Sequence, residues 1–137
     1  MKKILLLLFL FLIPNLVFSE QIKFKDNDEK YAFCKQLTNQ MAHMMPIRAD
    51  RISFLDSVVC IPGNPPQFTY SGVIELDFTK NKKMIIHSME INSREQKNLW
   101  CSDPGKKYIL ENFNIEQNFR DINGVFIDKI KLNSSDC

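Results

Sequence analysis

Four cysteines, Cys34, Cys60, Cys101 and Cys137, are the residues of this chain best suited to covalent chemistry. They are separated by 26, 41 and 36 residues, so the chain has no C-x-x-C pair, and neither histidine lies close to a cysteine in sequence. Zinc sites and dithiol redox motifs need closer spacing. An even number of cysteines in an exported chain predicts disulfides. We therefore expect neither a bound metal nor a catalytic thiol.

Chain geometry favours one of the three possible pairings. We expect a helix over residues 28–45, which rises about 1.5 Å per residue, and then a strand over residues 52–61, which advances about 3.3 Å per residue. The strand returns along the helix, so Cys60 comes back to the level of Cys34. Spacing alone leaves the other two pairings open. The predicted disulfides are Cys34–Cys60 and, by elimination, Cys101–Cys137.

Two histidines and a pair of acids are the other candidates for catalysis. His87 shares the apolar face of a predicted strand over residues 83–91, a position typical of a core histidine. Glu75 and Asp77 point to one face of the preceding strand, as the carboxylate pair of a glycosidase would. Their alternation with Ser and Thr instead indicates a solvated face. The chain has no nucleophile elbow, H-E-x-x-H or glycine-rich phosphate loop, so we predict no catalytic residue and no cofactor.

A proline-rich loop is the sharpest candidate for binding. It follows the strand over residues 52–61 and has few backbone donors. A stiff loop loses little entropy when it docks onto a partner. An ordinary connection between two strands is the competing interpretation. The predicted binding residues are Pro62, Asn64, Pro65, Pro66 and Phe68.

These residues need a scaffold of alternating elements. The clearest two-residue alternation predicts a strand over residues 68–79, and Asp103-Pro104 marks a helix start. Asn123-Gly124 predicts a tight hairpin turn. We expect a single α+β domain with two main helices on an antiparallel sheet of about five strands. The predicted order is helix 28–45, strands 52–61, 68–79 and 83–91, a helix from 103, and strands 115–121 and 125–132.

The first 19 residues have the pattern of a secretory signal peptide. Lys2 and Lys3 precede an unbroken apolar run from Ile4 to Ile13, which is too short to span a bilayer. We predict cleavage after Ser19, and the absence of cysteine there argues against a lipoprotein. An uncleaved N-terminal anchor is the alternative. We expect a periplasmic or secreted protein whose mature part, residues 20–137, inserts in no membrane.

The charge balance excludes some partners. The chain has 18 Lys and Arg against 16 Asp and Glu, and the predicted signal peptide contains two of the lysines. The mature chain is therefore neutral, whereas nucleic-acid binding needs a surplus of cations. We expect a protein partner in the envelope or outside the cell, and no nucleic acid.

The C-terminal third resembles a known family. The segments Leu99-Trp100-Cys101-Ser102-Asp103-Pro104 and Phe119-Arg120-Asp121-Ile122-Asn123-Gly124, with a final Cys137, are similar to the quorum-sensing-regulated virulence-factor family of Gram-negative bacteria. The resemblance implies an exported bacterial α/β protein with no catalytic residues to transfer.

Three functions are compatible with these patterns. The first is a non-enzymatic binding or accessory protein of the bacterial envelope or of virulence. The second is an inhibitor of a hydrolase such as lysozyme, which would insert the loop of Pro62 to Phe68 into a cleft. The third is a small hydrolase that uses His87 with an acidic partner.

Overall fold

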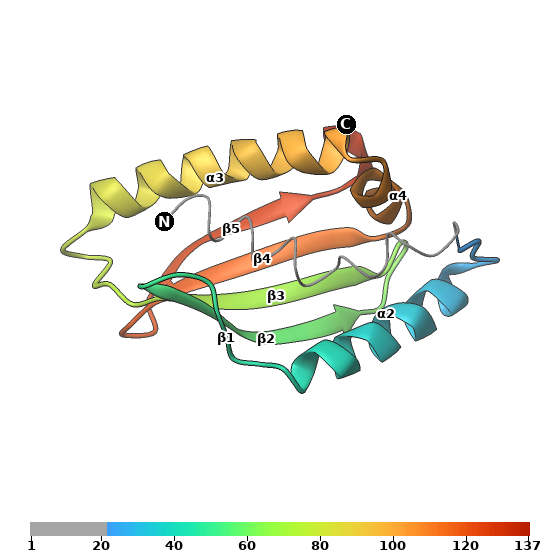
Figure 1. Ribbon diagram of the computed structural model, residues 1–137, viewed down its shortest axis with the longest axis horizontal. Helices are drawn as coiled ribbons and strands as arrows, with labels where there is room; N and C mark the ends of the chain where they lie inside the picture. Colours follow the sequence, from blue (N-terminus) through green and yellow to red (C-terminus); the bar gives the residue numbers. More distant parts are fainter. Residues whose placement is uncertain (1–21) are drawn as a thin grey trace.

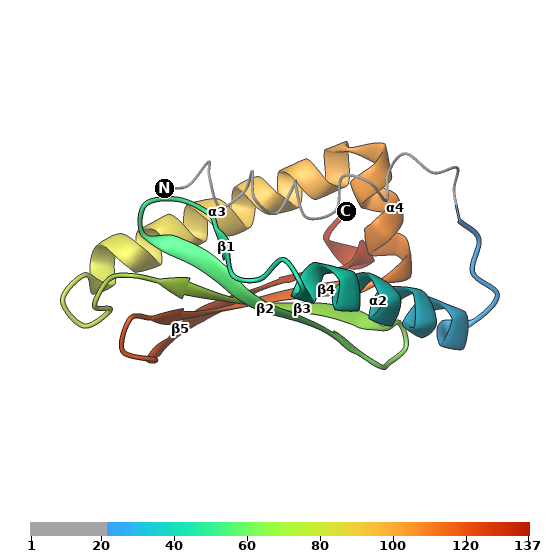
Figure 2. The ribbon, with the colours of Figure 1, turned by 60° about the horizontal axis from the view of Figure 1, so that its bottom comes forward.

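A five-stranded sheet forms the centre of the computed structural model, which describes residues 22–137. The strands lie side by side in their order along the chain. Figures 1 and 2 show the α-helices of the described chain on one face of this sheet. The predicted signal peptide, residues 1–19, lies outside the described residues. The elements are α2 (Asn27–Ala42), β1 (Ile47–Arg48), β2 (Ser53–Ile61), β3 (Gln67–Ile74), α3 (Lys82–Ser102), α4 (Pro104–Asn112), β4 (Asn114–Asp121), β5 (Phe126–Leu132) and the short 3-10 helix η2 (Ser134–Asp136).

The sheet is mixed, although the sequence predicts an antiparallel one. Neighbouring strands are antiparallel except at the centre, where β3 and β4 are parallel. Helices α3 and α4 carry the chain back between these two strands, so Gln67 pairs with Asn114 and Ile74 with Asp121. Parallel neighbours need a long crossover of this kind. The predicted single-domain α+β class is confirmed.

Helix α2 begins where the sequence predicts. Asp26 caps it by accepting a backbone N–H of the first turn at 2.9 Å, which satisfies a donor that the helix itself cannot. Met41 is buried on the face that packs against β2. The helix ends at Ala42, before the predicted Met45, and Met44 is 55% exposed. At this end of the helix, Met41 therefore packs in the core and Met44 does not.

Residues 83–91 form the first half of helix α3, and the prediction of a strand there is wrong. The inward face of α3 includes the polar residues Ser88, Asn92 and Gln96. Because these positions are polar, the apolar residues alone do not show the helical period. His87 is exposed on this helix, so the prediction of a core histidine is also wrong.

The strands next to α3 in sequence also differ from the predicted ones. Strand β3 ends at Ile74, so Leu76 and Phe78 lie in the connection to α3 and not in a strand. The two-residue strand β1 pairs with Phe54 and Leu55 of β2 at one edge of the sheet. A sheet of five strands therefore forms, but β1 replaces the strand predicted at residues 83–91.

The core lies between the sheet and its helices. Phe68 and Tyr70 of β3 are fully buried, as is Trp100 of α3. Gln96 and Gln117 hold each other through two amide hydrogen bonds of 3.2 and 2.9 Å, which satisfies two buried polar side chains. The outer face of the sheet carries no described helix (Figure 2).

Two local predictions for the C-terminal third are confirmed. Asp103 caps α4 by accepting the backbone N–H groups of Gly105 and Lys106 at 2.9 and 3.1 Å. Strands β4 and β5 form the predicted hairpin. Its turn differs from the two-residue form, because only Gly124 has a positive φ, of 82°.

Candidate functional site

The residues that could catalyse a reaction are dispersed over the structure. His87 has no hydrogen bond or ion pair with a carboxylate within residues 22–137. Glu75 forms an ion pair with Arg48, whereas Asp77 accepts the backbone N–H of Lys80. No group of three His, Cys, Asp or Glu in the described chain could hold a metal ion. Binding surfaces are therefore the features to compare.

Two disulfides hold one end of the molecule. They join Cys34 to Cys60 and Cys101 to Cys137, with Cα–Cα distances of 5.8 and 5.3 Å, and these are the pairs favoured by the sequence. Figures 1 and 2 place the start of α2, the end of α3 and the C-terminus together at the right of the sheet. We call this the disulfide end. One disulfide links α2 to β2 there, and the other links α3 to the C-terminus.

The proline-rich loop between β2 and β3 lies at the disulfide end. Pro66 is buried, and its carbonyl accepts the backbone N–H of Asn114 at 3.0 Å. The side-chain amide of Asn27, in α2, donates to Asn64 at 2.8 Å. The loop is thus fixed to α2 on one side and to β4 on the other.

Some of the residues predicted to bind in this loop are buried and anchor it, whereas the others lie on the surface. Phe68 is fully buried, with its ring 5.1 Å from that of Phe113, so its prediction as a contact residue is wrong. Pro66 is likewise buried and Pro65 half-buried. Pro62 and Asn64 are exposed. The buried anchors explain the sequence pattern, because alternation along β3 turns Phe68 inward.

Two exposed apolar residues extend the loop onto the outer face of the sheet. Val59 is 48% and Ile61 43% exposed, and both alternate with inward-facing residues of β2. The sequence-based interpretation missed them because β2 contains apolar residues on both faces. We call Val59, Ile61, Pro62 and Asn64 the proline-loop surface.

The opposite end of the sheet is organised by one buried carboxylate. Asp121, which is 1% exposed, accepts the backbone N–H groups of Asn123 and Val125 at 2.8 Å each. Its other oxygen accepts the N–H of Phe78 at 2.9 Å. These bonds join the turn between β4 and β5 to the loop before α3. We call residues 75–81 and 121–126 together the turn end.

Burial and hydrogen bonding oppose each other at Asp121. Burial acts to raise the pKa of this carboxyl, but the N–H groups of Phe78, Val125 and Asn123 outweigh it and hold the pKa below its ordinary value of 3.8. Asp121 is therefore ionised near neutral pH, where it can accept from all three donors. No disulfide reinforces this end.

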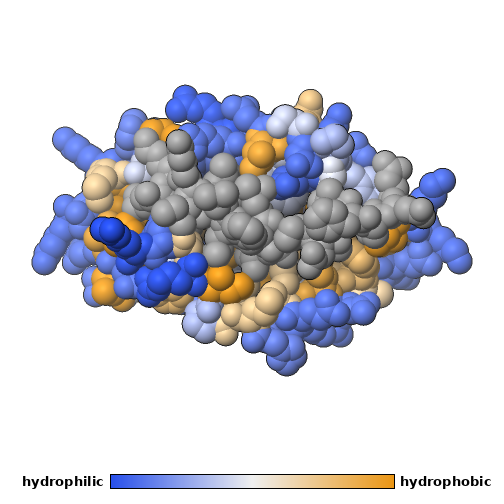
Figure 3. All heavy atoms as spheres, in the orientation of Figure 1, coloured by the Kyte–Doolittle hydropathy of each residue, from blue (hydrophilic) through white to orange (hydrophobic). Residues whose placement is uncertain are grey.

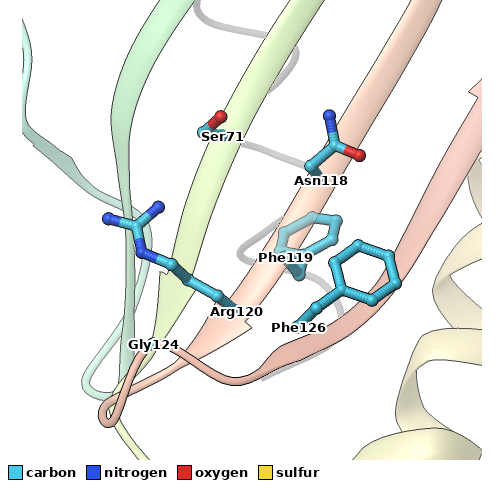
Figure 4. Close-up of a pocket in the computed structure, with 6 residues that line it drawn as sticks. All are labelled: Ser71, Asn118, Phe119, Arg120, Gly124 and Phe126. Carbon is cyan, nitrogen blue, oxygen red and sulfur yellow. The ribbon is translucent and has the colours of Figure 1, made fainter.

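The turn end presents apolar side chains to solvent. Ile122 is 59%, Val125 45% and Phe126 58% exposed. A shallow hollow of about 180 Å³ lies beside them on the sheet, with Phe126 and Phe119 on one side (Figure 4). The resemblance of this segment to a family gave no sign of this surface, although the run Ile122 to Phe126 is visibly rich in apolar residues for a turn. The hollow is lined by Ser71, Asn118, Phe119, Arg120, Gly124 and Phe126.

Comparisons with known proteins give the fold but no family. No family model matches the chain, and no curated protein matches it. A "putative secreted protein" from Pseudomonas aeruginosa has a similar structure, with a TM-score of 0.64 at 10% identity over 85% of this chain and 99% of that one. The pilotin EpsS of the Vibrio vulnificus type 2 secretion system gives 0.58 at 10% identity, over 81% and 94%. The type II secretion system pilotin AspS from Vibrio cholerae gives 0.52 at 8% identity, with the same coverage. The chain therefore shares its fold with these three proteins.

Proposed function

We propose that this chain is an exported accessory protein that binds a protein partner of the bacterial envelope through the proline-loop surface. The observation that carries the proposal is the fold, which two pilotins of type II secretion systems share over 81% of the chain. The two disulfides support export, because such bonds persist in oxidising compartments. The segment around Trp100 and Pro104 resembles the virulence-factor family, and this resemblance supports a role in virulence.

The geometry of the proline-loop surface favours binding. Its loop is anchored at Asn64 and Pro66, and the neighbouring Cys60 is tied to α2. An anchored loop has little freedom left to lose when a partner docks. Val59 and Ile61 add apolar area next to it that a partner could remove from water.

Inhibition of a hydrolase is the less favoured alternative. An inhibitory loop would need a large side chain to fill a cleft, and Phe68, its only aromatic candidate, is in the core. The exposed tip contains Pro62, Gly63 and Asn64, which are small or polar. A hydrolase based on His87 has no support, since His87 is exposed without a carboxylate partner in the described chain.

A pull-down from envelope extracts tests the proposal when it is made with matched variants. The oxidised protein should retain a specific partner, and Ile61→Asp should abolish retention because it places a charge in the apolar contact. Ile122→Asp is the control, since Ile122 is also exposed but lies at the turn end. Equal retention by both variants would reject the proline-loop surface as the binding site. Inhibition of purified lysozyme by the protein would instead favour the alternative.

A further inference from the structure

The exposed apolar residues of the turn end have no role in the proposed partner contact. Ile122, Val125 and Phe126 project from the turn and its adjoining strand, at the opposite end of the sheet from the proline loop (Figures 1 and 2). Turns normally carry polar residues or glycine, because their side chains stay in water. Three large apolar side chains within five residues therefore form an exposed patch of the kind that marks an interaction site.

The framework of the turn keeps these side chains outside. Asp121 accepts the backbone N–H groups of Asn123 and Val125, which flank Gly124, and Gly124 takes the positive φ that the turn needs. The N–H of Ile122 donates to the carbonyl of Leu76 at 3.4 Å. With its backbone held at these points, the turn cannot fold Ile122 and Val125 back into the core.

Unpaired cations adjoin the apolar patch. Lys80, Lys82 and Lys83 are exposed, and none of them forms an ion pair within residues 22–137. They belong to the same end, because Asp77 binds the N–H of Lys80 and receives a hydrogen bond of 3.4 Å from Asn123. In Figure 3, apolar and strongly hydrophilic side chains lie next to each other at the left of the molecule, where this end is.

Nearby acids leave the lysines largely uncompensated. Glu75 is paired with Arg48, Asp77 is engaged by the backbone, and Asp121 is buried. The first turn of α3 contains no acid, so its positive helix terminus adds to the charge of Lys82 and Lys83. Asp128, on β5, is the exposed acid closest in sequence to the apolar patch.

We propose that the turn end binds the surface of a bilayer that contains anionic phospholipid. The apolar side chains of Ile122, Val125 and Phe126 enter the boundary between headgroups and acyl chains, and the three lysines contact lipid phosphates. A bilayer fits better than a protein groove, because the apolar residues project from a hairpin turn and have free cations beside them. No helix among residues 22–137 has the length and apolar character to cross a membrane.

This orientation would leave the proline-loop surface pointing away from the membrane. The two surfaces lie at opposite ends of the sheet, so lipid binding at one does not cover the other (Figure 1). The lipid contact does not depend on the proposed protein partner, so an experiment can reject either proposal and leave the other in place.

Vesicle flotation tests the proposal directly. The exported, oxidised protein should float with vesicles of phosphatidylethanolamine and phosphatidylglycerol, bind phosphatidylcholine vesicles more weakly, and dissociate at high salt. Lys80→Gln, Lys82→Gln and Lys83→Gln combined should weaken binding to the anionic vesicles at least about tenfold. The double variant Ile122→Ser and Phe126→Ser should also weaken it, whereas Ile61→Ser at the disulfide end should bind like the wild type.

The lysine variant keeps the test valid if the apolar variant is unstable, because its three side chains are exposed and unpaired in the described chain. Circular dichroism would show that each variant is folded. Failure of the wild-type protein to bind anionic vesicles would overturn the proposal. So would equal binding by the wild type and both turn-end variants, or retention of a protein at this end in place of lipid.

Discussion

The two ends of the sheet are held by different kinds of bond. At the disulfide end, the Cys34–Cys60 link and a ring cluster around Phe113 fix the loop between β2 and β3, and the Cys101–Cys137 link ties the end of α3 to the C-terminus. At the turn end, the carboxylate of Asp121 and its backbone donors fix two loops without a disulfide. The first end should therefore respond to reducing agents, whereas the second has no disulfide that they could cleave.

The difference also suggests how two contacts can share a small protein. A covalently held loop keeps its shape for a protein partner, while a hydrogen-bonded turn presents apolar side chains to a fluid surface. Each end can be weakened separately by substitutions that leave the other in place. The following predictions are ordered from the largest expected effect to the smallest.

Removing Phe68 should cause the largest loss of stability. Phe68→Ala deletes a fully buried ring that packs on Phe113 and should lower the free energy of unfolding by about 3–5 kcal/mol. Pro62→Ala, in the exposed part of the same loop, should change it by less than about 0.5 kcal/mol. Urea unfolding of the oxidised proteins measures both, and equal effects would contradict the division into anchors and surface.

Removing the disulfide of the loop should cost somewhat less. Cys34→Ala with Cys60→Ala opens a loop of 26 residues and should lower the free energy of unfolding by about 3–4 kcal/mol. Hydrogen exchange should speed up at the Asn114 amide, which donates to Pro66 of the loop, while the turn end keeps its protection. Equal loosening of both ends would show that they are not held independently.

Acid should loosen the turn end through Asp121. Because the pKa of Asp121 is lower in the folded than in the unfolded protein, its contribution is full above the ordinary value of 3.8 and is lost as pH falls through the folded pKa. Asp121→Asn should remove this part of the acid dependence and speed exchange of the Asn123 and Val125 amides. Thermal unfolding between neutral pH and pH 3 provides the measurement. An unchanged pH profile in the variant would contradict the assigned role of Asp121.

Exposed apolar residues should matter least for stability. Ile122→Ser should change the free energy of unfolding by less than about 0.5 kcal/mol, because the side chain is 59% exposed. A large decrease in the free energy of unfolding, measured with urea, would mean that Ile122 packs in the structure and is not free to contact lipid.

Local signals predicted much of the fold. Asp103-Pro104 marked the start of α4, and the alternation along residues 68–74 marked the buried face of β3. The pairing of Cys34 with Cys60 followed from helix and strand rise alone. These features depend on short stretches of chain whose geometry is nearly fixed by residue type.

Tertiary context decided what the sequence could not show. The inward polar residues of α3, such as Gln96, are satisfied by a distant strand through Gln117, so no local pattern reveals that this face is buried. Phe68 was predicted to bind together with the proline-rich loop that it follows, yet Phe113 covers it. The turn end was missed for a similar reason, since Asp121 joins segments more than 40 residues apart.

Site-specific photocrosslinking in intact envelopes tests the separation of the two surfaces most directly. A photoreactive residue would replace Ile61 in one protein and Ile122 in another. We predict a discrete protein adduct from position 61, and from position 122 lipid adducts without that protein. The same protein adduct from both positions, or none from position 61, would contradict the account.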